Sequence, residues 1–177
     1  AAGAGLYWMN QKQRAREAFE LYGQSLGVQF VETASQGIVV ATGDMRALDP
    51  TVATGRGGVL GLAGVDPVTR QTTVIMDNAE NWYESFGASD DPLRPYSWFE
   101  TALREIGHAL GLGNTYELPP GTVMGSDSEL AFENAKVPEP IYPGDQDIVH
   151  GRHLYRNEGK DIDLYRFELT EGGVLTA

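Results

Sequence analysis

The sequence predicts an α/β domain, and two patterns support this prediction. Residues 11–26 carry apolar side chains at spacings of three and four, which is the stripe of an amphipathic helix. Short apolar runs follow, each bounded by Gly, Pro, Asp or Ser turn residues, as expected for strands. We therefore expect a helix packed on a sheet over most of the chain.

The first half of the chain is predicted to contain one helix and four strands. The helical stripe consists of Ala15, Ala18, Phe19, Tyr22 and Leu26, and Gly27 ends it. The predicted strands are residues 28–32, 38–42, 59–65 and 72–76. Residues 81–95 are predicted to form a loop, because prolines interrupt any regular element there.

A second helix is predicted to begin after Ser97. The sequence Ser97-Trp-Phe-Glu100 matches a capping box, in which side chains satisfy the unpaired amides at a helix start. The helix is expected to run to about Leu110 and to end at Gly111, since glycine readily adopts the left-handed conformation found at helix ends. This helix carries the most informative motif of the chain.

The rest of the chain is less regular. Residues 112–143 contain many loop residues and predict an irregular subdomain. A last helix is predicted over 146–155, and 161–169 then alternate between polar and apolar residues. This alternation predicts either an edge strand or the start of a second domain, and both interpretations stay open.

Composition excludes several classes of protein. The chain has 177 residues, a net charge of −12 and no cysteine. Phosphate binding needs clustered Lys and Arg, so a nucleic-acid partner is not expected. Disulfides and cysteine-based zinc sites are excluded. No apolar stretch approaches the roughly 18 residues that would predict a transmembrane segment, and the first residues lack a signal-peptide pattern. We expect the chain to be part of a longer multidomain protein.

The most informative segment lies on the second predicted helix. Residues 104–114 read R-E-I-G-H-A-L-G-L-G-N, which matches the zinc-binding pattern H-E-x-x-H-x-x-G-x-x-H except at its first and third histidines. On a helix, positions four apart share a face, so two histidines can point at one ion while the glutamate reaches a metal-bound water. Arg104 and Asn114 stand at the two altered positions.

With Glu105, His108 and Gly111 in place, the chain resembles the metzincin peptidases, especially the matrixin and serralysin branches. Residues 122–125 resemble the methionine turn that lies below the zinc, with Met124 as its methionine. Residues 73–82 resemble the strand and turn that precede the matrixin active-site helix. The resemblance covers roughly residues 14–156, in family order.

This resemblance implies the metzincin (zincin) fold: a twisted, mixed sheet of about four or five strands, mostly parallel, with an antiparallel edge strand. A backing helix, an active-site helix and a small C-terminal subdomain complete it. Residues 1–157 would form the peptidase-like domain, divided into 1–111 and 112–157, and 158–177 would be a tail resembling the start of a β-sandwich domain. The resemblance also implies a secreted or cell-surface bacterial protein whose substrate or ligand is a peptide or protein.

The altered residues bear directly on zinc. Arg104 has only hydrogen-bond donors and repels a cation, and Asn114 offers a weak amide oxygen, so His108 alone remains a strong ligand. A catalytic zinc needs three protein ligands. Without the metal, Glu105, the catalytic residue by resemblance, has no activated water to deprotonate. We hypothesise that Arg104 fills the space of the zinc and pairs with Glu105 or with other acidic groups.

Two functions from different classes follow. The first is a metzincin-like pseudoenzyme that serves as a binding or structural module. The second is a zinc metalloendopeptidase, either represented here by a variant of an active parent or acting through an unconventional site. In an active parent, histidines at 104, 108 and 114 would hold zinc, and the edge strand near Val74 would align an extended substrate.

Other candidate sites are weaker. The acidic pairs Asp77 with Glu80 and Asp90 with Asp91 predict either calcium sites, as in many matrixins and serralysins, or a solvated acidic loop. His150 and His153 have a spacing compatible with a metal, but no third ligand is evident, and an ordinary helix surface is the competing interpretation.

Overall fold

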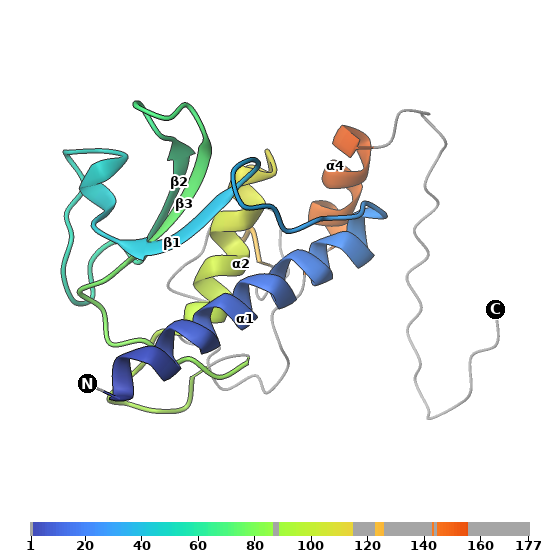
Figure 1. Ribbon diagram of the computed structural model, residues 1–177. Coiled ribbons are helices and arrows are strands. Elements are labelled where there is room, and N and C mark those ends of the chain that lie inside the picture. The colour runs from blue at the N-terminus through green and yellow to red at the C-terminus, as the bar shows by residue number, and fades with distance from the viewer. Residues whose placement is uncertain (1, 87–88, 115–122, 126–142, 144, 156–177) are drawn as a thin grey trace, which may run out of the picture.

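The computed structural model describes residues 2–86, 89–114, 123–125, 143 and 145–155. These residues form a mixed α/β structure with a small sheet and three α-helices (Figure 1). The elements are α1 (Ala2–Leu26), β1 (Val39–Gly43), the short 3-10 helix η1 (Met45–Ala47), β2 (Gly61–Val65), β3 (Thr72–Asp77), α2 (Trp98–Ala109) and α4 (Asp145–Tyr155).

The sheet has the strand order β1-β3-β2. β1 runs parallel to β3, with Val40 opposite Val74, whereas β2 is antiparallel, with Ala63 opposite Val74. The central strand is therefore β3, and Val74 is fully buried. This corrects the expectation that an edge strand lies near Val74: the antiparallel edge strand is β2, because β3 is paired on both sides.

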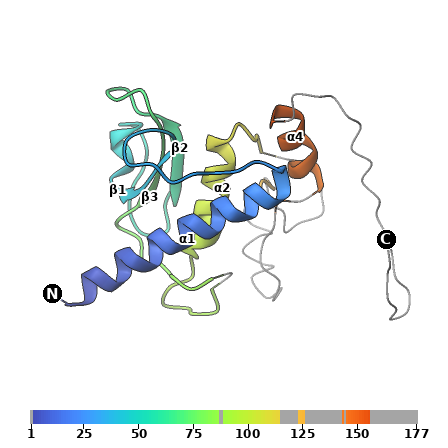
Figure 2. The same cartoon turned by 45° about the vertical axis from the view of Figure 1, so that its right-hand side comes forward.

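The helix α2 connects the sheet to α1, because it packs on β2 and β3 and also on α1. Both views show α1 running across the molecule, with α4 beside its carboxyl end (Figures 1 and 2). Arg152 of α4 fixes this contact by donating to the Ser25 carbonyl at 2.8 Å. The largest fully buried apolar and aromatic side chains are Trp98, Tyr22, Phe99, Leu26, Met45, Met76, Leu103, Ile106, Met124 and Val74. The site helix is thus anchored on two sides.

Local signals in the sequence locate the helix ends well. Gly27 has a φ of 69° and its amide donates to Gly23, which confirms the predicted stop of α1. The Ser97 hydroxyl accepts from the Glu100 amide at 3.3 Å, as a helix cap does. Gly111 has a φ of 92° just beyond α2. The helix α1 begins earlier than predicted, at Ala2, in a stretch whose alanines favour helix without forming a clear stripe.

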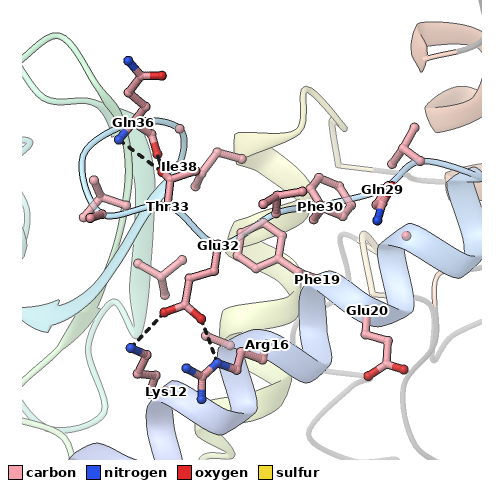
Figure 3. A pocket seen from close by; sticks show the side chains of 18 of the residues that line it. Lys12, Arg16, Phe19, Glu20, Gln29, Phe30, Glu32, Thr33, Gln36 and Ile38 are labelled. Carbon is pink, nitrogen blue, oxygen red and sulfur yellow. Dashed lines mark hydrogen bonds and ion pairs between the residues drawn. The ribbon is translucent and has the colours of Figure 1, made fainter.

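The predicted strand at residues 28–32 is wrong. This segment pairs with no strand among the described residues, because its side chains are committed to α1 instead. The ring of Phe30 packs on that of Phe19 at an interplanar angle of 53°, with centroids 5.2 Å apart, and Glu32 forms ion pairs with Lys12 and Arg16 at 2.9 Å (Figure 3). A cavity of about 1220 Å³ lies between this segment, α1 and β1. The described sheet accordingly has three strands rather than four or five.

The carboxyl-terminal predictions are only partly covered by the structure. The helix predicted over 146–155 is present as α4 (Asp145–Tyr155). Most of the irregular segment 112–143 and the whole of the alternating segment 161–169 lie outside the described residues. The division into two subdomains and a tail stays a prediction.

Candidate functional site

The candidate site lies on the helix α2 and on two short segments beside it. One face of α2 is buried against the sheet and α1, and it carries Trp98, Phe99, Ala102, Leu103 and Ile106. Residues Arg104, Glu105 and His108 lie at the margin of this face and are half-buried. The helical repeat therefore places the three motif side chains next to a rigid core while leaving them accessible.

The Arg104 guanidinium connects three segments of the chain. Its Nη1 donates to the carbonyl oxygen of Val123 at 3.0 Å and to that of Gly125 at 2.5 Å. Its Nη2 donates to Oδ1 of Asn114 at 2.7 Å. A permanently charged, planar fork with five N–H groups can serve several acceptors in this way. The arginine thus joins α2 to the residue at the third ligand position of the motif and to the turn at 123–125.

His108 is oriented by the turn that follows α2. Its Nδ1 lies 2.9 Å from the carbonyl oxygen of Leu112, and because a carbonyl can only accept, Nδ1 carries the hydrogen. In the neutral form of the ring the lone pair then lies on Nε2. A carbonyl that fixes the tautomer of a histidine is the usual second partner in metal sites, so His108 retains the form of a ligand.

Glu105 lies against the edge strand β2. Burial raises the pKa of the Glu105 carboxyl, while the proximity of His108 and Arg104 and a hydrogen bond from the Ala63 backbone oppose that rise. A side chain at position 61 would come within 2.8 Å of the Glu105 Cγ atom, so Gly61 makes room for it. The carboxyl is therefore placed between α2 and β2.

Met124 lies directly under α2. It is fully buried, and its sulfur lies 3.8 Å from the hydroxyl of Tyr22, which donates to the Leu103 carbonyl at 3.0 Å. A Cβ at Gly107 would meet the Met124 sulfur at 2.5 Å. Glycine at 107 therefore permits the close approach of this turn to the helix.

The residues present do not fit a catalytic zinc. His108 offers one strong donor, the Asn114 oxygen accepts from Arg104, and Arg104 itself is a cation. Within the described residues, no group of three or more His, Cys, Asp or Glu side chains could hold a metal ion. The guanidinium already binds the Asn114 oxygen, and its positive charge would repel a zinc ion brought to His108.

Most of the acidic residues considered for calcium form hydrogen bonds that hold loops. The Asp77 carboxylate accepts from the amide of Gly55 at 2.8 Å, and Glu80 accepts from that of Gly57 at 2.7 Å. Asp91 accepts from the Leu93 amide and forms an ion pair with Arg94 at 2.8 Å. The exposed Asp90 precedes this turn. His150 and His153 are exposed on α4.

Two contributors to the site have no signature in the sequence. The carbonyl oxygens of Val123 and Gly125 are backbone groups, so no residue type identifies them. Tyr22 belonged to the predicted helical stripe, but its hydroxyl contact beneath the site depends on how α1 crosses α2. The pairing of Arg104 with Asn114 could have been predicted from the sequence, provided that the chain was assumed to turn back towards the helix after Gly111.

Three further observations bear on the class of the protein. No helix in the described part of the chain is both long and apolar enough to cross a membrane. A search of curated proteins finds no match. The sequence model of the matrixin family matches residues 4–131, which is more than half of the chain and includes α1, the sheet, α2 and Met124. The chain belongs to the matrixin family.

Proposed function

We propose that this chain is a matrixin domain without peptidase activity, and that it serves as a binding or structural module. One observation carries the proposal: the Arg104 guanidinium, at the first ligand position, donates to Asn114 at the third. Two of the three ligand positions are therefore bonded to each other. The family implies zinc and protein substrates, and it is the zinc that these side chains oppose.

The chemistry of Glu105 explains why loss of the metal removes activity. Zinc lowers the pKa of a bound water from 15.7 to about 7 and polarises the peptide carbonyl. A guanidinium can donate a hydrogen bond to that carbonyl, but it does not bind water as a Lewis acid does. Glu105 would have to deprotonate ordinary water, and a carboxylate is far too weak a base for that step.

Extended polypeptide is the ligand that we propose for the module. The order β1-β3-β2 leaves the outer edge of β2 without a partner among the described strands. An added strand would satisfy its backbone groups, and the buried carboxyl of Glu105 lies beside this strand. We also propose that the protein is secreted or attached to the cell surface, because matrixins are typically extracellular. The proposal includes membership of a longer chain and calcium binding.

The second candidate is a zinc metalloendopeptidase. The frame of Glu105, His108, Gly111 and Met124 favours it, because the helix, its turn and the underlying methionine are arranged around the ligand positions. A parent chain with histidines at 104 and 114 would regain three nitrogen ligands. In this interpretation the chain is an inactivated form of an enzyme that keeps the site helix, its turn and the underlying methionine.

Zinc content and hydrolysis of a quenched fluorescent peptide distinguish these candidates. The unaltered chain is expected to retain far less than one zinc per molecule after dialysis and to cleave nothing above background. The double variant Arg104→His/Asn114→His is expected to retain about one zinc. Adding Glu105→Gln to it provides the control, because this change leaves the three nitrogens in place and removes the base.

Stoichiometric zinc in the unaltered chain, or hydrolysis that a zinc chelator abolishes, would contradict the proposal. Peptide binding is measured separately, by fluorescence anisotropy with an extended peptide and its backbone N-methylated counterpart. Binding to β2 is expected for the first alone, because methylation removes the main-chain donors that strand addition needs. Equal binding of both peptides would exclude the sheet edge as the binding surface.

A further inference from the structure

The first ligand position of the motif carries a positive charge that belongs to the chain itself. We infer that the Arg104 guanidinium is a structural substitute for the family's zinc, which holds α2, the segment after Gly111 and the turn at 123–125 together without a metal. The inference rests on the proposal that this domain works without zinc, and it adds a specific task for the arginine. Arg104 is thus a positioning residue.

The separation in sequence between Arg104 and its partners supports this role. Arg104 reaches Asn114 ten residues away, Val123 nineteen residues away and Gly125 twenty-one residues away. Each contact joins α2 to a segment that follows it in the chain. A metal with ligands at positions 104, 108 and 114 would close the loop to residue 114, and the guanidinium closes it together with the loop to the turn at 123–125.

The carbonyl oxygens of the turn at 123–125 also depend on Arg104 as a hydrogen-bond donor. Val123 is 4% exposed, so its carbonyl oxygen has little access to water as an alternative partner. A buried carbonyl without a hydrogen-bond donor destabilises the fold by more than a typical hydrogen bond stabilises it, because its loss of hydration is not compensated. A charged donor forms stronger hydrogen bonds than a neutral one. The same guanidinium therefore satisfies an otherwise poorly hydrated turn and fixes it below α2.

The first test compares the thermal unfolding of three chains. Arg104→Met keeps the length of the side chain and removes its donors, and we expect Tm to fall by about 5 °C. Arg16→Met is the matched control, because Arg16 is an exposed arginine on α1 whose ion pair contributes little, and its Tm should change by less than about 2 °C. The chelator 1,10-phenanthroline, which removes zinc, should leave Tm of the unaltered chain unchanged.

The second test exchanges the arginine for the metal. The variant Arg104→His/Asn114→His should be less stable than the unaltered chain in the chelator, and added zinc should raise its Tm. Hydrogen exchange at 123–125 should increase at least tenfold in Arg104→Met and not in Arg16→Met. Equal Tm values for Arg104→Met and Arg16→Met would overturn the inference, as would a metal-free double variant as stable as the unaltered chain. Hydrolysis by the unaltered chain instead refutes the proposed function, so the two failures are distinguishable.

Discussion

Replacing Gly107 with alanine tests whether the turn at Met124 packs as closely under α2 as the structure places it. A Cβ at this position would lie 2.5 Å from the Met124 sulfur and would overlap the hydroxyl of Tyr22. Tyr22 is fully buried and bonded to the Leu103 carbonyl, so its ring has no space to withdraw. The new methyl group must therefore displace the methionine, the helix or both.

Two opposing effects set the size of the change. Alanine is better than glycine inside a helix by about 1 kcal/mol. Overpacking a dense core costs about 1 to 3 kcal/mol, and the two close neighbours place Gly107→Ala at the upper end. We therefore expect the free energy of unfolding to fall by about 2 kcal/mol, which lowers Tm by about 4 to 8 °C in a domain of this size.

Urea unfolding followed by tryptophan fluorescence measures this loss. The midpoint should fall by about 1 M if the urea dependence is about 2 kcal/mol per M. Gly113→Ala is the matched control, because no atom of the described residues lies within 4 Å of a Cβ at that position. Adding Tyr22→Phe to Gly107→Ala should recover part of the loss by removing the overlapping hydroxyl. If Gly107→Ala is as stable as Gly113→Ala, the packing described for Met124 is wrong.

Two further changes test the charges on and around α2. Burial raises the pKa of Glu100 from 4.5 to about 7, so the folded state binds the proton more tightly, and stability should fall as pH rises from about 4.5 to 7. The helix start favours the ionised carboxylate by at most about 1 kcal/mol, which is less than the free energy that corresponds to this pKa shift. Glu100→Gln should therefore make Tm less dependent on pH. An unchanged dependence would contradict the assignment of this effect to Glu100. Asn114→Asp gives Arg104 a carboxylate partner at an exposed site, so Tm should rise by about 1 to 3 °C in low salt and the gain should vanish in 1 M NaCl. A gain that persists in high salt would point to a different cause.

The sequence predicted the elements that local signals define. Ser97 and Gly111 delimit α2 through chemistry that acts within one helical turn, and both were found where predicted. The strand predicted at 28–32 shows the limit of such signals. Its apolar residues fit a strand equally well, but pairing depends on a distant partner, whereas Phe19 of α1 lies within reach of Phe30. Tertiary packing determined the outcome.

The candidate site was predictable to a similar degree. The helical spacing brought Arg104, Glu105 and His108 to one region, as expected. The prediction that Arg104 would pair with Glu105 or another acidic group missed its principal partners. Two of these are carbonyl oxygens, which every residue carries, so only the three-dimensional path of the chain could identify them.

The relation between Arg104 and Asn114 bears on how the two altered positions are to be interpreted. Two independent losses of histidine would leave side chains with no particular fit to each other. Here the donor at 104 meets an acceptor at 114 at 2.7 Å. If only one of the two positions carried histidine, the residue at the other position would face an imidazole instead of the amide or guanidinium that now matches it. This complementarity favours a site adapted to a fixed internal cation, because each replacement supplies what the other requires.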